Sequence, residues 1–466
     1  MTTTLASAGP QTSDRRRWAV LAVVLFAAIL DLLDATITNI AAPTIAADLR
    51  GGDALVQWLG ASYALAMGVL LVVGGRLGDK YGRRRLFLAG ITGFTIMSIG
   101  CGLATGPASV VVFRLLQGAF GALLIPQGFG ILGAVFPRDE IGKAFGVFVP
   151  ALGLSAIGGP VLAGFLIQAD LFGLGWRPMF LINIVLGGLA IGLAARILPR
   201  DAGDRTVTVD GLGSGLLAAT MLGLLYGLID GSSHGWTAVP ILALAVGTVF
   251  FGLFCLRQRN AASPLIEPSV LKNRGFTSGL ILGLVFYAAV SGLLFVLSLF
   301  LQDVLHRTPG QASLGLAPLA AGIIVASIAA HNLLARLGRT LVLIGLALVL
   351  AGTVSLLVLV HTQGAALPAW ALIAPVFVCG LGLGTCFGTV YGVTLGDIDP
   401  KESGSASGSL SAVQQLANSI GAAAITTVYF HSSHGTEQSL AVVAVLTLVC
   451  CALVRLMPRN AQPQHH

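Results

Sequence analysis

Charged residues are scarce in this sequence. Of its 466 residues only 10% are Asp, Glu, Lys or Arg, whereas 56% are hydrophobic and the mean hydropathy is +0.91. A water-soluble domain cannot bury that much apolar surface, so a soluble fold is excluded. Basic residues still outnumber acidic ones and give a net charge of +7. We attribute this excess to orientation in a membrane and expect no nucleic acid as a partner.

The sequence also lacks the residue patterns of metal centres and enzyme active sites. Its 6 cysteines lie in or beside apolar runs and form no CxxC pair, which argues against a disulfide or metal framework. No nucleophile–base set and no large hydrophilic segment is present, so a polytopic membrane enzyme or sensor is a remote alternative. We expect no catalytic residue, no metal site and no cofactor.

Long apolar runs dominate what remains. Each is about twenty residues long, the length that a helix needs to cross a bilayer, so we predict an all-α membrane protein with fourteen spans. The even number of spans and the basic run Arg15–Arg17 predict that both termini face the cytoplasm of a multi-pass protein of the cell membrane. The predicted spans are 18–41, 55–74, 86–104, 109–135, 143–168, 178–198, 212–230, 237–256, 276–302, 312–335, 340–360, 366–395, 407–430 and 438–457.

A short, strongly charged segment, Gly75–Leu86, separates the second and third runs, and we call it the signature loop. It reads GRLGDKYGRRRL, and its basic residues place it on the cytoplasmic side. The pattern resembles the signature loop of the major facilitator superfamily, which implies a cytoplasmic gating role. The residues that carry the pattern are Gly75, Asp79, Gly82, Arg83 and Arg84.

An eroded copy of this loop occurs at 331–339, where Gly338 aligns with Gly82 and Ala335 replaces Asp79. Two copies of one loop indicate two copies of one half, as is typical of this transporter class. The copy follows the tenth span, so two helices are inserted between the halves. We therefore predict a tail at 1–17, a six-helix bundle at 18–205, a two-helix insert at 206–260, a second six-helix bundle at 261–457 and a tail at 458–466.

The first span contains two carboxylates, Asp31 and Asp34, on one helix face. Ionisable residues inside a span are costly and indicate function, and two nearby acids in low dielectric favour proton binding. Arg114, in the fourth span, needs a buried partner, and either acid is a candidate. Together these three residues predict a proton-coupling site.

Several motifs resemble those of the fourteen-span drug:proton antiporter family. The run Leu33–Pro43 resembles its first-helix motif, which implies that Asp34 is the first choice for proton coupling and that Asp31, outside the motif, is the second. The fifth span resembles a motif typical of antiporters, in which small residues allow close helix packing. Its residues are Gly153, Gly158, Gly159, Pro160 and Gly164, and the polar residues that we expect around a cavity are Asn39, Gln117, Asn183, Gln414 and Asn418.

The resemblance implies an antiporter with the major facilitator fold, and we expect it to act as a monomer. Driven by the proton gradient, it would export hydrophobic or amphiphilic small molecules, such as drugs or antibiotics, across the lipid bilayer by alternating access. The alternative within the same fold is a proton symporter that imports a metabolite. The sequence leaves open which of the two acids in the first span carries the proton.

Overall fold

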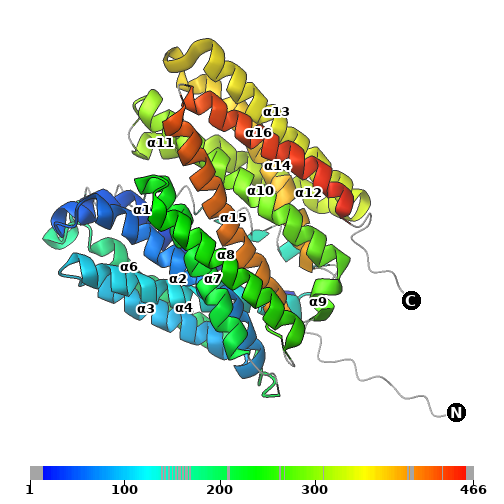
Figure 1. Ribbon diagram of the computed structural model, residues 1–466. Helices are drawn as coiled ribbons and strands as arrows, with labels where there is room; N and C mark the ends of the chain where they lie inside the picture. The colour runs from blue at the N-terminus through cyan, green and yellow to red at the C-terminus, as the bar shows by residue number, and fades with distance from the viewer. Residues whose placement is uncertain are drawn as a thin grey trace.

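The computed structural model is entirely helical in the part of the chain that it describes (Figure 1). A backbone inside a lipid bilayer must satisfy its hydrogen bonds internally, and long apolar helices do so. The described residues are 14–137, 140, 143–144, 147–148, 151–152, 155, 159, 162, 166, 169–206, 210–261, 264–266, 268–307, 309–395, 398, 403–432 and 434–457.

The first half of the chain forms one group of packed helices. Within it α2 packs on α4, α3 packs on α4 and α6, and α1 packs on α2 and α6. Most of the predicted fifth span lies outside the described residues. The helices are α1 (Asp14–Asp48), α2 (Gly52–Tyr81), α3 (Arg83–Gly102), α4 (Pro107–Val135) and α6 (Pro178–Ile197), with a short 3-10 turn at Leu171–Gly173.

Two of these helices are longer than the predicted spans. α1 begins at Asp14, inside the predicted N-terminal tail, and continues through Pro43 to Asp48. α2 continues to Tyr81, so most of the signature loop is helical and only Gly82 separates α2 from α3. Gly82 has φ 96°, a conformation that glycine adopts without steric cost. The sharp reversal therefore needs one residue instead of a longer loop.

The second half forms another group of helices, in which α14 packs on α12 and α13, and α10 packs on α15 and α16. α15 also packs on α2 and α4 and so connects the two groups (Figure 1). The helices are α9 (Pro268–Lys272), α10 (Arg274–Leu299), α11 (Pro309–Gly315), α12 (Ala317–Leu337), α13 (Arg339–Gln363), α14 (Ile373–Leu395), α15 (Ser403–His431) and α16 (Gly435–Leu453). Shorter turns are a π-helix at Phe300–Val304 and 3-10 turns at Gly364–Ala366, Ala369–Leu372 and Val454–Leu456.

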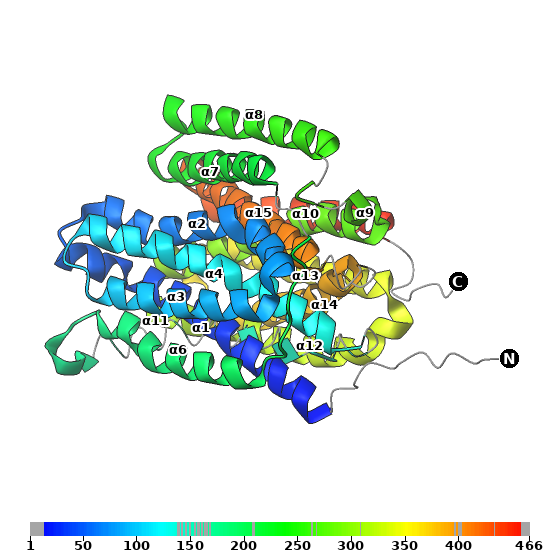
Figure 2. The same cartoon turned by 90° about the horizontal axis from the view of Figure 1, so that it is seen from below.

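The two remaining helices, α7 (Gly211–His234) and α8 (Ala238–Asn260), form a hairpin outside both groups (Figure 2). Gly223 and Gly247 let the two helices approach closely, because a Cβ on Gly223 would lie 2.7 Å from the Cα of Gly247. α7 packs against α2 and α15, one helix from each half. The hairpin therefore lies over the seam between the halves.

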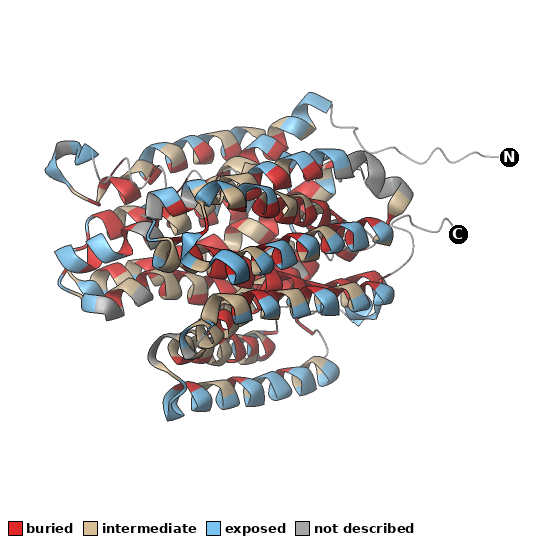
Figure 3. Cartoon of the chain, turned by 90° about the horizontal axis from the view of Figure 1, so that it is seen from above, coloured by how far each residue is buried: buried red, intermediate tan, exposed pale blue. Residues whose placement is uncertain are grey.

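Burial follows this layout. Buried residues gather towards the interior and exposed residues lie on the outer faces of the helices (Figure 3). On α8 the exposed residues include large apolar side chains such as Leu242 and Val249, which are 64% and 62% exposed. Apolar side chains on an outer face are expected where lipid, not water, surrounds the protein.

Eleven helices in the described part of the chain are long and apolar enough to cross a membrane, and Ala317–Ala329 is a shorter apolar helix. The chain is thus a multi-pass membrane protein. The predicted number of fourteen spans stays a prediction.

Candidate functional site

The innermost charged groups of the first half form an ion pair between α1 and α4. Nη1 of Arg114 lies 2.5 Å from Oδ2 of Asp34, and both side chains are 1% exposed. Nε of Arg114 donates to the carbonyl of Leu59 at 3.2 Å. Of the two partners that the sequence allowed for Arg114, the structure therefore selects Asp34.

Two amide side chains complete the environment of this carboxylate. Oδ1 of Asp34 accepts hydrogen bonds from Nδ2 of Asn183 at 2.8 Å and from Nε2 of Gln117 at 3.0 Å. Gln117 in turn accepts from Nη1 of Arg114 at 2.8 Å, and Asn183 donates to Oγ of Ser98 at 2.8 Å. A buried ion pair is stable when additional hydrogen bonds satisfy both members, as they do here. Gln117 and Asn183 were expected to line a cavity. They instead donate hydrogen bonds to Asp34.

Asp31 lies one helical turn earlier and has different surroundings. Its Oδ1 accepts a hydrogen bond from the hydroxyl of Tyr63 on α2. The guanidinium of Arg114 lies 4.5 Å from the centre of the Tyr63 ring. Space for the contact comes from Gly121 on α4, where a Cβ would lie 2.8 Å from the Tyr63 hydroxyl and 3.1 Å from Oδ1 of Asp31. Tyr63 therefore connects the two acids of α1 through Arg114.

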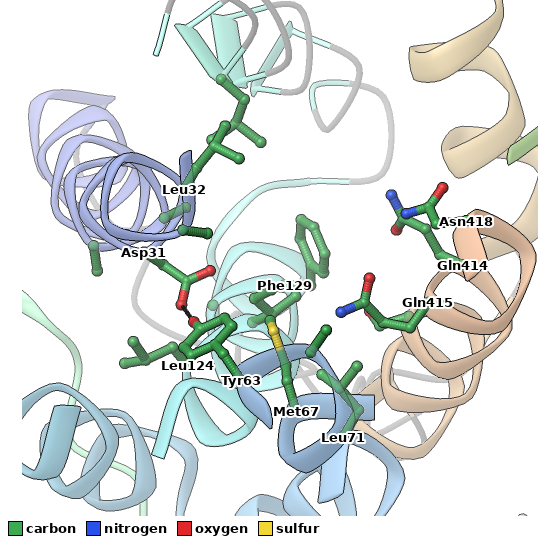
Figure 4. A pocket seen from close by; sticks show the side chains of 18 of the residues that line it. Asp31, Leu32, Tyr63, Met67, Leu71, Leu124, Phe129, Gln414, Gln415 and Asn418 are labelled. Carbon is green, nitrogen blue, oxygen red and sulfur yellow. Dashed lines mark hydrogen bonds between the residues drawn. The ribbon is translucent and has the colours of Figure 1, made fainter. Parts of the chain in front are cut away.

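A cavity of about 360 Å³ opens beside Asp31. Helices α1, α2 and α4 form one side, and α15 of the second half forms the other (Figure 4). This volume is typical of sites for small organic ligands. Asp31, Tyr63 and Arg114 line the cavity, whereas Asp34 does not. Most of its wall is apolar and includes Val24, Leu32, Met67, Leu71, Phe87, Leu124, Ile125, Phe129, Phe148 and Leu152.

The side of the cavity formed by α15 is polar but uncharged. Gln414, Gln415 and Asn418 line it, opposite Asp31 and Tyr63 (Figure 4). Gln414 and Asn418 were expected at a cavity, and Gln415 is an addition. Among the described residues, the side-chain amides of Gln415 and Asn418 have no hydrogen-bond partner. These two amides are therefore available to a ligand.

The signature loop is held by residues far away in the sequence. Arg83 pairs with Asp79 at 3.1 Å and donates to the carbonyl of Gly130 on α4 at 2.9 Å. The carboxylate of Asp201, which follows α6, accepts from the backbone N–H groups of Arg83 and Arg84 at 2.5 and 3.1 Å and so caps α3. The motif residues thus form one connected contact between α2, α3, α4 and the segment after α6.

The side chains at 403–405, at the start of α15, lie outside the described residues. The halves do meet nearby: a Cβ on Gly408 would lie 2.9 Å from the carbonyl of Leu71, and Oγ of Ser407 donates to the carbonyl of Pro126 at 3.5 Å.

The remaining predicted residues are covered only in part. In the fifth span Gly159 is described, and a Cβ there would lie 2.0 Å from Oγ1 of Thr36, so this glycine permits close contact with α1. Gly153, Gly158, Pro160 and Gly164 lie outside the described residues, as does the side chain of Asn39. Gly75 is buried within α2.

Three residues with clear contacts were missed by sequence reasoning. Tyr63 lies in an apolar span, and Asp201 is one of four charged residues at 200–205, where the sequence gives no reason to single it out. Asp48 accepts from Nε1 of Trp176 at 2.9 Å and from Arg177 at 3.0 Å, and these two hydrogen bonds lower the pKa of its carboxyl. The adjacent donors Trp176 and Arg177 were the sequence feature that could have indicated a carboxylate partner such as Asp48.

These features define a class: a multi-pass membrane protein with a ligand-sized cavity between two helical halves and buried ionisable groups beside it. The sequence model of the family described as the Major Facilitator Superfamily matches this chain twice, at residues 24–211 and 208–422. The chain belongs to this superfamily.

Relatives with assigned names agree with this assignment. A probable actinorhodin transporter of Streptomyces coelicolor is 42% identical over 420 residues, which are 89% of this chain and 73% of that protein. The tetracenomycin C resistance and export protein of Streptomyces glaucescens is 34% identical over 69% of this chain and 60% of its own length. The puromycin resistance protein pur8 of Streptomyces alboniger is 32% identical over 94% and 88%.

Solved structures show the same fold at low sequence identity. The human organic anion transporter MFSD10 (TETRAN) has a TM-score of 0.70 at 15% identity and covers 95% of this chain and 100% of its own. The proton:xylose symporter XylE has a TM-score of 0.68 at 14% identity and covers 95% of each chain.

Proposed function

We propose that this protein is a proton-driven antiporter that exports hydrophobic or amphiphilic small molecules, antibiotics among them, by alternating access. The observation that carries the proposal is a carboxylate, Asp31, in the wall of a cavity to which both halves contribute. A carboxylate at such a place can bind a proton from one side of the membrane and release it to the other. The relatives support export, since one is named an export protein and two others are named a transporter and a resistance protein.

The proposal includes the finer family and topology. It places the chain in the fourteen-span drug:proton antiporter family, with two six-helix bundles at 18–205 and 261–457 and a two-helix insert at 206–260. Both termini and the signature loop face the cytoplasm of the cell membrane, because basic residues concentrate there. The protein works as a monomer without a cofactor, on protons and on a small-molecule substrate within the lipid bilayer.

Alternating access requires the contact between the halves to open and close. Near the signature loop, α15 lies against α2 and α4 through Gly408 and Ser407. Separation at this point opens the cavity to the cytoplasm, and the Arg83–Asp79 pair keeps the ends of α2 and α3 together on the first-half side of the contact. Gly159 of the fifth span allows close packing on α1, and the glycine–proline pattern of that span favours antiport over symport.

Everted membrane vesicles with an acidic interior and a pH-sensitive dye test the direction of coupling. Actinorhodin, tetracenomycin C and puromycin are suitable first compounds. We expect at least one to release protons from vesicles that contain the wild type, and none to do so from vesicles with Asp31→Asn/Asp34→Asn. Compound-induced proton entry into the vesicle, instead of release, would identify an importer that works by symport in the cell. Transport of the compounds with no proton movement would overturn proton coupling.

A further inference from the structure

We propose that the cavity holds an uncharged, flat amphiphile at two points, a hydroxyl group on Asp31 and a carbonyl or hydroxyl group on the amides of α15. At the first point the proton and the substrate compete for the same carboxylate. The inference rests on the proposed function and deepens it. It assigns the exchange of proton and substrate to Asp31 with Tyr63, and it leaves Asp34 as the fixed counter-ion of Arg114.

Access distinguishes the two acids. Asp34 is enclosed by three donors, the guanidinium of Arg114 and the amides of Gln117 and Asn183, and it does not reach the cavity. Asp31 has one described hydrogen-bond donor, the Tyr63 hydroxyl, and it lines the cavity. A proton or a ligand that enters the cavity therefore meets Asp31 first.

The charges around Asp31 favour a reversible exchange. The ionisable and charged groups that face it are Tyr63 from α2, Arg114 from α4 and Asp34 from its own helix. The polar residues that α15 contributes to the cavity are uncharged: Ser411, Gln414, Gln415 and Asn418. Arg114 and Asp34 neutralise each other. The cavity is thus neutral when Asp31 is protonated and carries one negative charge when it is ionised.

The exchange needs no covalent step. Protonated Asp31 loses its proton to water on the side to which the cavity is open, and the carboxylate then accepts a hydrogen bond from a hydroxyl of the substrate. Proton return to Asp31 removes this acceptor and weakens the substrate's hold. Tyr63 can donate to the carboxylate in the empty site, which limits the cost of leaving it without a ligand.

The opposite wall selects for uncharged polar groups. The free amides of Gln415 and Asn418 each offer a donor and an acceptor, which match carbonyl and hydroxyl groups. Buried polar groups that bind a substrate group discriminate strongly against analogues that lack it. Between the two polar walls lie Phe129 and Met67, side chains that pack well on flat aromatic rings (Figure 4).

The test measures binding to the purified protein in lipid nanodiscs, so it does not depend on transport. A monohydroxyanthraquinone and its methyl ether serve as matched probes, because the ether has the same ring system and lacks the hydroxyl donor. In weak buffer, we expect the hydroxy compound to bind the wild type with release of a proton and to bind at least about threefold more tightly than the ether. Equal affinity of the two probes for the wild type would overturn the first contact.

Variants separate the two points of contact. In Asp31→Asn we expect loss of proton release and of the preference for the hydroxy compound. Gln415→Met and Asn418→Leu each weaken binding of both probes by about three- to tenfold and leave proton release per bound molecule unchanged. Ser419→Ala on α15 is the matched control, since that hydroxyl donates to the helix backbone at 3.1 Å and is expected to leave affinity at the wild-type value.

Tyr63→Phe keeps the ring beneath Arg114 and removes only the hydroxyl. We expect this variant to bind the hydroxy compound more tightly than the wild type does. Tyr226→Phe on α7 is the control variant. Proton release on binding that persists in Asp31→Asn would overturn the assignment to Asp31. If binding behaves as described but vesicles show no coupled export, the site is correct and the proposed function fails. If vesicles show coupled export but both α15 variants bind like the wild type, the second contact is wrong and the function stands.

Discussion

Asp31, Asp34 and Arg114 all lie in the first half of the chain, whereas between Asp303 and Asp397 the second half has no acidic residue at all. The two halves are related by the repeated loop, and Gly338 adopts a positive φ of 47° just before α13, as Gly82 does before α3. Both copies thus have a glycine with positive φ followed by an arginine, Arg83 or Arg339. The acid Asp79 has no counterpart in the second copy, where Ala335 takes its place.

The comparison teaches that the halves contribute different chemistry to one cavity. The first half supplies the carboxylate and its charged neighbours, and the second half supplies uncharged amides from α15. Charged groups in a membrane are costly, and this cavity has them on the side of the first half. Substitutions test this contrast. We expect those in the charged network of the first half to lower the free energy of unfolding more than those at sites without charged contacts.

The largest effect is expected for Arg114→Met. It leaves Asp34 buried without its counter-ion, which should lower the free energy of unfolding by about 3–5 kcal/mol. Thermal unfolding of the purified protein in detergent measures the loss. The double variant Arg114→Met/Asp34→Leu removes both charges and should regain most of the stability. A double variant as unstable as the single one would show that the loss comes from packing and not from an unpaired charge.

The next effect is expected for Gly121→Ala, which tests the contact between Tyr63 and Asp31. The new Cβ would lie 2.8 Å from the tyrosine hydroxyl, so side chains must shift at a cost of about 1–3 kcal/mol. Gly133→Ala on the same helix is the control, because nothing lies within 4 Å of a Cβ there. That variant should be neutral or stabilised by up to about 1 kcal/mol. Equal unfolding temperatures for the two variants would contradict the crowded site around Gly121.

A smaller effect should distinguish the two copies of the loop. Asp201 caps the start of α3, whereas α13 begins at Gly338 with no side-chain cap. Asp201→Ala should cost about 1 kcal/mol, the usual value of a lost helix cap, and Asp201→Asn should cost less. Thermal unfolding again gives the comparison, together with amide hydrogen exchange at Arg83 and Arg84. Unchanged exchange at these two amides in Asp201→Ala would show that the cap does not stabilise α3.

Much of this architecture follows from the sequence. Apolar runs of spanning length gave helices at nearly the predicted positions, because a membrane allows the backbone few other choices. The helix ends were less predictable. The charges of Gly75–Leu86 suggested a loop, but charged residues at a membrane surface extend a helix readily, and α2 reaches Tyr81.

The charged residues of the candidate site could be predicted from the sequence, but their uncharged hydrogen-bond partners could not. A buried arginine requires an acid, so the pairing of Arg114 with one of the acids of α1 could be anticipated. Motif resemblance ranked Asp34 first for proton coupling, but resemblance does not report access, and only the structure shows Asp31 at the cavity. Tyr63 could not have been found, because a tyrosine on an apolar helix has many possible neighbours and its partner depends on the crossing of α1 and α2.

The smallest effect is expected at the base of the α7–α8 hairpin, where no motif residue lies. Arg257 donates to Asp210 at 3.0 Å and holds the pKa of that carboxyl below its usual value of 3.8. Because the pKa is lowered in the folded protein, this pair stabilises the fold at neutral pH, and the stabilisation is lost as the pH falls through the folded pKa. Asp210→Asn should therefore lower the unfolding temperature slightly at neutral pH and match the wild type in strong acid. A difference of the same size at both pH values would assign the effect to packing of the side chain. A large loss of export in this variant would show instead that the hairpin takes part in the motion between the halves, since α7 contacts both of them.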